Sequence, residues 1–188
     1  MQKVIILSGA SGAGKNTLGD FLLQQFPELS YSVSATSRAI RKGEQDGVDY
    51  HYLDTEEFER KIKEDALLEW QEVYDGMYYG TLKSELDRIN SLNKYPLLVI
   101  DVFAAINIMK NLKFKPLSIF IQVPSIQILE ERLRTRGADT EEKIQKRLDK
   151  ASIETDKAKF FDITIMNDDL KTAQYQLAEI VNYFLHKN

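Results

Sequence analysis

The segment from Gly9 to Lys15 reads Gly-Ala-Ser-Gly-Ala-Gly-Lys, and these residue types are suited to holding phosphate. Glycines let successive backbone N–H groups point at one anion, and a helix that begins at the loop adds partial positive charge. A short apolar strand precedes the loop and a helical pattern follows it, as this chemistry requires. The lysine can neutralise the outer phosphates of a nucleoside triphosphate. The predicted triphosphate contacts are Gly9, Ala10, Ser11, Gly12, Ala13, Gly14, Lys15, Asn16 and Thr17.

Asn16 stands where such loops usually carry a serine or threonine whose hydroxyl binds Mg²⁺. The asparagine carbonyl oxygen is a possible metal ligand, but its side chain is longer and its amide adds donors. Asp101 ends an apolar run that begins at Pro96, where open α/β sheets bind ligands. A helix cap is the alternative role for Asp101. We expect Mg²⁺ to accompany ATP, with Asn16 and Asp101 contacting it through water.

Short apolar runs alternate with segments of helical spacing along most of the chain. Continuous apolar runs are typical of strands buried on both faces. The alternation predicts an α/β fold with a central parallel sheet flanked by helices. Strands are expected at 4–7, 31–34, 96–101, 117–123 and 163–166, and helices at 17–26, 54–63, 83–90, 125–136, 140–156 and 170–185.

The polar, turn-rich middle of the chain interrupts this alternation. It contains two short strand patterns around Asp75-Gly76, a dipeptide favoured in hairpin turns. We therefore predict one domain of 188 residues with an inserted subdomain and a short arginine-rich segment. The expected bounds are about 1–33, 83–124 and 150–188 for the core, 34–82 for the insertion, and 125–149 for the arginine-rich segment.

A succession of dispersed motifs begins in the middle segment. In chain order these are Ser34–Arg41, Gly43-Glu44, Asp46–Tyr50, Glu69-Trp70, Gly76–Thr81, Arg132–Gly137, Arg147 and Asn167–Asp169. In their order and spacing they resemble the guanylate kinase family, and the resemblance runs essentially from end to end. It implies a P-loop kinase that uses ATP to convert GMP into GDP, with the arginine-rich segment 125–149 as its lid.

The resemblance implies that the middle segment binds GMP. Arg38 and Arg41 can hold the phosphate with two-pronged hydrogen bonds, and Tyr50 and Tyr79 can add phenolic donors. Glu69 matches the family's carboxylate that accepts from the N1–H and N2–H₂ groups of guanine. A base without these donors would leave the carboxylate unpaired. The implied GMP-binding residues are Ser34, Arg38, Arg41, Tyr50, Glu69, Tyr79, Thr81 and Asp101.

The arginines near residue 135 resemble the family's lid arginines, which close over the donor triphosphate. In-line phosphoryl transfer needs positioning, charge neutralisation and exclusion of water more than covalent chemistry. The segment Asn167-Asp168 resembles the one near the donor adenine and joins the ATP-binding set. The implied catalytic residues are Lys15, Arg132, Arg136 and Arg147.

The sequence departs from the family pattern near Asp101. Val99 stands where the family usually has an acidic residue, and Phe103-Ala104 replaces the usual Gln-Gly. Together with Asn16, these changes bear on rate and metal geometry more than on fold or ligand class.

Two other functions stay open at this point. A non-catalytic guanylate-kinase-like binding module is one, although such modules typically lose the phosphate loop that this chain keeps. A kinase of a phosphorylated sugar is the other, and it predicts loss of Glu69 and its hydroxyl partners, which are present.

The composition limits the partners. A net charge of -4 gives no electrostatic footprint for nucleic acid or an anionic membrane surface. No stretch approaches the roughly 20 apolar residues of a membrane span. The absence of cysteine excludes disulfides and thiolate metal sites, and fits a reducing compartment such as the cytoplasm. We expect small-molecule substrates only, and the oligomeric state is left open.

Overall fold

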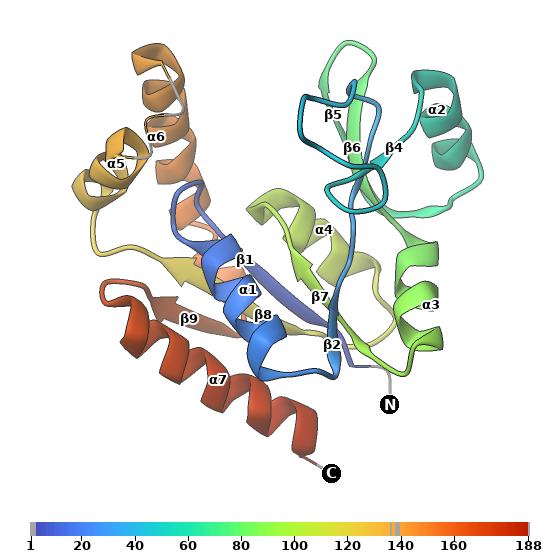
Figure 1. Ribbon diagram of the computed structural model, residues 1–188. Coiled ribbons are helices and arrows are strands. Elements are labelled where there is room, and N and C mark those ends of the chain that lie inside the picture. Colours follow the sequence, from blue (N-terminus) through green and yellow to red (C-terminus); the bar gives the residue numbers. More distant parts are fainter. Residues whose placement is uncertain (1–2, 136, 138–139, 188) are drawn as a thin grey trace.

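The structure is a computed structural model that describes residues 3–135, 137 and 140–187. Its core is a five-stranded parallel sheet in the order β2-β7-β1-β8-β9, with helices on both faces (Figure 1). This confirms the predicted α/β class. The strands are β1 (Ile5–Gly9), β2 (Leu29–Tyr31), β7 (Tyr95–Val99), β8 (Leu117–Gln122) and β9 (Ile163–Met166).

Alternating side chains of the central strands form the two halves of the core. Ile5 and Leu7 of β1 pack in one cluster with residues of α1 (Lys15–Gln25) and α7 (Leu170–His186). Ile6 points to the other face and packs with α4 (Val102–Asn111). This alternation follows from the period of two along a strand. The remaining helices are α2 (Thr55–Lys63), α3 (Lys83–Ser91), α5 (Ile126–Thr135), α6 (Glu141–Thr155) and the short 3₁₀ turn Ala158–Phe160.

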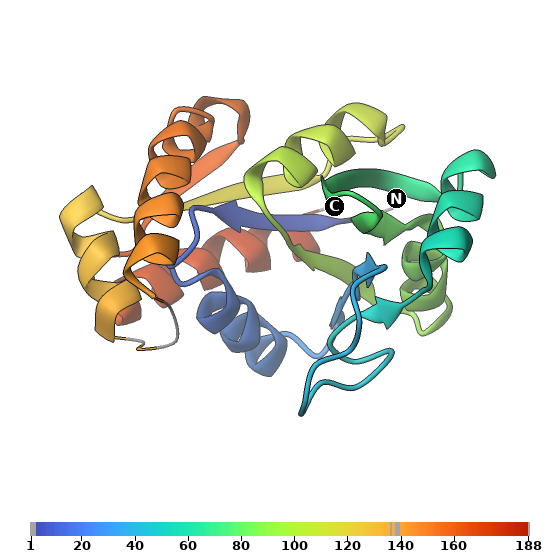
Figure 2. The same cartoon turned by 90° about the horizontal axis from the view of Figure 1, so that it is seen from above.

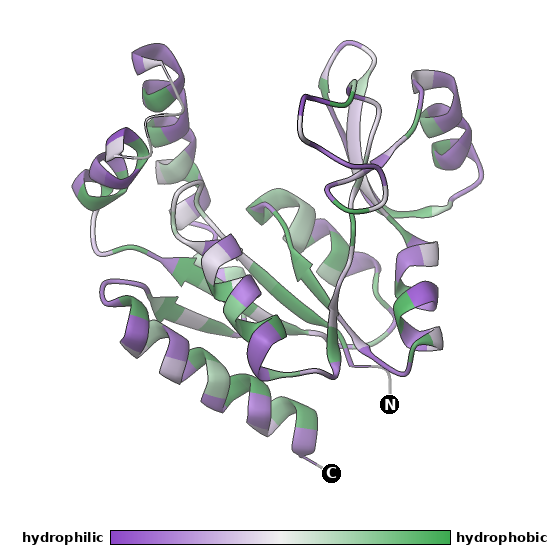
Figure 3. Ribbon diagram, viewed as in Figure 1, coloured by the Kyte–Doolittle hydropathy of each residue, from purple (hydrophilic) through white to green (hydrophobic). Residues whose placement is uncertain are grey.

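A second sheet, β4-β3-β6-β5, lies beyond the carboxyl ends of the core strands (Figure 1, upper right). It has a small apolar core of its own, in which the rings of Phe58 and Tyr78 stack with centroids 5.3 Å apart. Figure 3 shows that apolar residues concentrate in the central sheet, whereas the second sheet and its helix α2 are mostly polar. The strands are β3 (Ala35–Thr36), β4 (His51–Tyr52), β5 (Leu67–Tyr74) and β6 (Met77–Leu82).

Viewed from above, α5 and α6 lie at one end of the core and the second sheet lies at the other (Figure 2). The phosphate loop, Gly9–Lys15, follows β1 between these two ends. No helix in the described part of the chain is long and apolar enough to cross a membrane.

Several elements differ from the sequence-based expectation, and the short strands β3 and β4 and the 3₁₀ turn are not among the predicted ones. The predicted strand at 31–34 is wrong in its bounds, because β2 ends at Tyr31 and the next residues lead the chain out of the core sheet. The helix α4 is not predicted by the sequence pattern. Its residues are apolar on nearly every side, and such a run does not distinguish a buried helix from a buried strand.

Candidate active site

The phosphate loop has positive φ at three glycines, Gly9, Gly12 and Gly14. Gly9 has φ +147°, and a Cβ there would lie 2.2 Å from the carbonyl oxygen of Ile121 on β8. Gly14 has φ +94° in the left-handed region and forms the N-cap of α1. The loop therefore passes close to the sheet and ends at a helix N-terminus, which favours an anion.

The side chain of Lys15 folds back over this loop. Its ammonium group donates to the carbonyl oxygens of Gly9, at 2.7 Å, and Ala10, at 3.1 Å. Burial lowers the pKa of Lys15, while the charges of Glu154 and Asp101 oppose that shift. The one strong cation of the loop is thus held at its centre by backbone acceptors.

Asn167, which follows β9, holds the phosphate loop through its side chain. Its side-chain amide donates to the carbonyl oxygen of Ala13 at 2.8 Å, and the residue is only 4% exposed. A Cβ on Gly14 would lie 2.4 Å from the same amide nitrogen. The side chain of Asn167 therefore contacts the phosphate loop itself and helps to fix the loop's path.

The helices α5 and α6 pack on the other side of the loop. Leu129 and Leu133 of α5 form one apolar cluster with Ala10 and with residues of α6. Arg132 donates to the backbone oxygens of Asn167, at 2.8 Å, and Asp168, at 3.3 Å. A cavity of about 530 Å³ lies between α5 and the segment after β9, and its lining residues are Ile128, Glu131, Arg132, Thr135 and Asp168.

Two more arginines of this region were named from the sequence. Arg147 of α6 donates to the hydroxyl of Ser11 at 2.8 Å, so it contacts the phosphate loop directly. Arg136 lies outside the described residues. Arg134, to which no role was assigned, pairs with Glu130 at 2.8 Å and with Glu141 of α6, and so links the two helices.

On the side of the second sheet, a cavity of about 400 Å³ brings predicted residues of both halves together. We call it the acceptor cavity. Glu69 is joined there by Gln71 and Val73, which the sequence analysis missed although a strand period of two places them on one face. Its lining residues are Lys15, Ser34, Tyr50, Glu69, Gln71, Val73, Tyr79, Gly80, Val99, Ile100, Asp101 and Ala104.

Glu69 lies at the buried end of this cavity. It is 8% exposed, and the hydroxyl of Thr81 donates to its Oε1 at 3.0 Å. Burial raises the pKa of Glu69 to about 7, despite the opposing hydrogen bond from Thr81. A carboxylate kept from water in this way has a strong need for hydrogen-bond donors from a ligand.

Arg38 is not among the lining residues, and its guanidinium is already engaged. It donates to both carboxylate oxygens of Glu44 at 2.9 Å, to the hydroxyl of Tyr79 at 3.2 Å, and to its neighbour's carbonyl at 2.8 Å. These bonds use four of the five N–H donors of an arginine. The hydrogen bonds from Arg38 also lower the pKa of Glu44 to about 2. A phosphate would bind to the remaining donor or displace Glu44.

The other predicted contacts around this pair differ in exposure. Arg41 is exposed, and its backbone N–H donates to Glu44 at 2.8 Å. The ring of Tyr50 lies 5.4 Å from the Arg38 guanidinium carbon and edge-on to Tyr79 at 5.9 Å. Glu44 was present in the sequence motif after Gly43 but received no role. The structure assigns Glu44 to the site through its hydrogen bonds from Arg38 and Arg41.

Asp101 and Asn16 were proposed for a metal. Oδ1 of Asp101 accepts from the backbone N–H groups of Phe103, at 2.9 Å, and Ala104, at 3.0 Å, so the residue caps α4. Both bonds go to one oxygen, and the carboxylate still lines the acceptor cavity. Asn16 is exposed at the start of α1. The described residues contain no group of three acidic or histidine side chains that would hold a metal alone.

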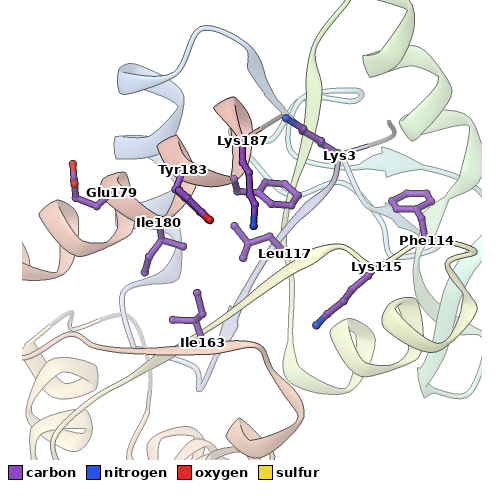
Figure 4. Close-up of a pocket in the computed structure, with 10 residues that line it drawn as sticks. Lys3, Phe114, Lys115, Leu117, Ile163, Glu179, Ile180, Tyr183 and Lys187 are labelled. Carbon is purple, nitrogen blue, oxygen red and sulfur yellow. The ribbon is translucent and has the colours of Figure 1, made fainter.

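A larger cavity, of about 920 Å³, contains none of these residues. It lies at the amino ends of β8 and β9, beside Leu117 and Ile163, and α7 contributes Ile180 and Tyr183 (Figure 4). Since ligands of parallel α/β sheets bind at the carboxyl ends of the strands, the arrangement around the phosphate loop is the candidate site.

Comparisons with known proteins agree with this geometry. The family model described as guanylate kinase matches residues 1–183. A protein named guanylate kinase from Porphyromonas gingivalis is 44% identical over 188 residues, which is 100% of both chains. The chain belongs to the guanylate kinase family. A further relative, from Chlorobium chlorochromatii, is 43% identical over 182 residues, 96% of this chain and 95% of its own.

A solved structure supports the same family and fold. The crystal structure of guanylate kinase from Anaplasma phagocytophilum superposes with a TM-score of 0.76 and 30% sequence identity. The alignment covers 100% of this chain and 88% of that one. The guanylate kinase fold, recognised from dispersed motifs, therefore extends over the whole sequence.

Proposed function

We infer that this chain transfers the γ-phosphoryl group of ATP to GMP and forms ADP and GDP. Lys15 carries this conclusion, because it belongs to two sites at once. Its ammonium group contacts the phosphate loop, and its side chain also lines the acceptor cavity. A cation between a triphosphate loop and a monophosphate site is positioned for a phosphoryl group that passes from one to the other.

We propose that the donor side uses the phosphate loop and the arginines of the α5–α6 pair. The loop N–H groups and Lys15 hold the β- and γ-phosphates. Arg147, already bonded to Ser11, and Arg132 add positive charge where charge develops in the transition state. Arg136 is proposed for the same role from the family resemblance alone. Asp168 lines the cavity proposed for the donor adenine.

On the acceptor side, we propose that Glu69 accepts hydrogen bonds from the N1–H and N2–H₂ groups of guanine. Thr81 and Ser34 contribute hydroxyls beside it. Arg38, Arg41, Tyr50 and Tyr79 hold the phosphate of GMP. Adenine lacks this pair of donors, so its binding would leave the buried carboxylate with the hydroxyl of Thr81 but without the two ligand donors.

We propose Mg²⁺ as the cofactor of the donor nucleotide. Mg²⁺ usually keeps several waters and takes only one or two protein ligands beside the phosphates. The amide of Asn16 and the second carboxylate oxygen of Asp101 fit that requirement as partners of metal-bound water. When bound, the ion neutralises charge on the transferring phosphate. We propose the cytoplasm as the compartment, where ATP and GMP are available to the enzyme.

The decisive test is ADP release by purified protein with ATP and one acceptor at a time. GMP, dGMP, AMP and a sugar phosphate are compared, each with and without Mg²⁺. Turnover with GMP well above that with AMP, and dependent on Mg²⁺, is expected. Binding of GMP without turnover would indicate a binding module instead, and preference for the sugar phosphate would indicate the third function.

A further inference from the structure

Glu85 of α3 is a buried carboxylate that no part of the proposed mechanism uses. Its side chain is 3% exposed, and it lies outside the acceptor cavity. Burying a charge costs free energy unless hydrogen bonds and opposite charge compensate. The contacts that compensate Glu85 come from three different segments of the chain.

One oxygen of Glu85 connects the second sheet with α3. Oε1 lies 2.9 Å from Nε2 of His51 in β4 and accepts from Nε of Arg88 at 2.8 Å. Burial favours the neutral form, but the hydrogen bonds from Arg88, Val33 and His51 prevail and lower the pKa of Glu85 to about 2. An ionised carboxylate only accepts hydrogen bonds, so His51 carries its proton on Nε2.

The other oxygen of Glu85 connects α3 with the segment that leaves the core sheet after β2. Oε2 accepts from the backbone N–H of Val33 at 2.9 Å and from Nη2 of Arg88 at 2.9 Å. The same Nη2 donates to the carbonyl of Tyr31, the last residue of β2, at 3.3 Å. Glu85 thus joins both crossings between the two sheets, the outgoing one at Val33 and the returning one at the start of α3.

These contacts are one residue away from two proposed GMP contacts. Val33 precedes Ser34, and His51 follows Tyr50, both of which line the acceptor cavity. A further bond, from the backbone N–H of His51 to the carbonyl of Ser34 at 2.8 Å, ties the two segments to each other. A change at Glu85 would therefore move Ser34 and Tyr50 relative to the core.

We propose that Glu85 is a positioning residue for the acceptor site, which fixes Ser34 and Tyr50 in the arrangement that GMP binding requires. The proposal rests on the proposed function for the identity of the ligand. It predicts an effect on the acceptor nucleotide alone, because the phosphate loop and the α5–α6 pair make no hydrogen bond to Glu85 among the described residues.

The first test compares Glu85→Gln with Asp87→Asn, which removes the same charge from an exposed position of the same helix. The amide of Gln has an NH₂ group in place of one carboxylate oxygen. The hydrogen bonds that this oxygen accepts in the wild type are therefore lost. We expect the KM for GMP to rise about tenfold and the KM for ATP to change less than about twofold, with Asp87→Asn at wild-type values. A lower melting temperature with both KM values unchanged would mean a structural role only, and would overturn the proposal.

A second pair of variants covers the case in which Glu85→Gln does not fold. His51 is 29% exposed, so its substitution is less disruptive. His51→Phe removes the Nε2–H donor to Glu85 and should raise the KM for GMP about threefold through loss of one hydrogen bond. His51→Gln keeps an N–H donor and should restore most of that loss. Equal GMP KM values for His51→Phe and the wild type would contradict the proposal.

The wild-type protein separates this proposal from the proposed function. If wild type turns over GMP but no variant changes its KM, only the role of Glu85 is refuted. If wild type does not turn over GMP, the function is refuted, and calorimetric binding of GMP to the same variants decides on Glu85. An unchanged dissociation constant in that experiment would refute the positioning role as well.

Discussion

Compared with the second sheet, the phosphate loop contributes few side chains to its ligand site. It offers backbone N–H groups, a helix N-terminus and one lysine, all within Gly9–Lys15. The second sheet instead offers side chains from separate strands and from the loop after β3, such as Tyr79, Glu69 and Arg38, already bonded to one another or to neighbours. The loop can bind phosphate of any nucleotide, whereas the second sheet can select a base.

The two regions also differ in what holds them in place. The loop is fixed by the close approach of Gly9 to β8 and, in large part, by hydrogen bonds to its own backbone, including those from Asn167 to Ala13 and from Lys15 to Gly9. The acceptor residues are held by charged hydrogen bonds, from Arg38 with Glu44 to Glu85 with its three segments. Substitutions on the two sides should therefore affect different kinetic constants, and the following predictions test that separation.

The largest effect is expected for Lys15→Ala. It removes the only cation that both contacts the loop and lines the acceptor cavity in the described part of the chain. We expect kcat to fall by at least about a thousandfold, as for the loss of a group that stabilises transferring phosphate. The matched control is Lys113→Ala, an exposed lysine far along the chain. Activity within tenfold of wild type would contradict the role of Lys15.

Glu69→Gln should affect the acceptor side alone. The NH₂ group of the glutamine side chain would face the N–H groups of guanine, and two donors cannot bind each other. We therefore expect the KM for GMP to rise roughly 10- to 100-fold. The KM for ATP should stay near the wild-type value. Glu56→Gln, at an exposed position of α2, is the control. Equal losses for the two nucleotides would break the separation between the two regions.

Asn167→Ala should affect the donor side alone. The carbonyl of Ala13 would lose its partner and the loop its anchor, so the KM for ATP should rise about tenfold, with that for GMP nearly unchanged. Asn182→Ala, at an exposed position of α7, removes an amide without touching the loop. An effect on GMP as large as that on ATP would show that the loop anchor also shapes the acceptor site.

The smallest effect concerns stability and pH. Burial raises the pKa of Glu69 from 4.5 to about 7, so the folded protein holds this proton more tightly than the unfolded chain. The resulting stabilisation is present at low pH and is lost as pH rises through about 7. Without nucleotide, the unfolding free energy of the wild type should fall by about 2 kcal/mol relative to that of Glu69→Gln between pH 5.5 and pH 8.5.

Denaturant titrations of both proteins at the two pH values measure this difference. The Glu56→Gln variant, altered at an exposed site, should show the wild-type pH dependence. Parallel curves for Glu69→Gln and wild type would mean that the carboxylate is not shielded from water, and would weaken the case for base selection by an unpaired buried group.

The sequence by itself determined the phosphate loop and the α/β class. The loop is contiguous, so Gly9, Gly14 and Lys15 reveal their chemistry by spacing alone. Parallel strands buried on both faces leave long apolar runs, which made the core sheet predictable. The acceptor residues are dispersed, and only the resemblance to a family assigned them roles in advance.

Tertiary structure alone decided the supporting contacts. The amide of Asn167 meets the carbonyl of Ala13 across 154 positions of sequence, and no local pattern predicts such a bond. The same holds for Glu85, whose partners Val33 and His51 lie 52 and 34 positions away. A buried polar group must find partners wherever the fold brings them, whereas a loop motif carries its own.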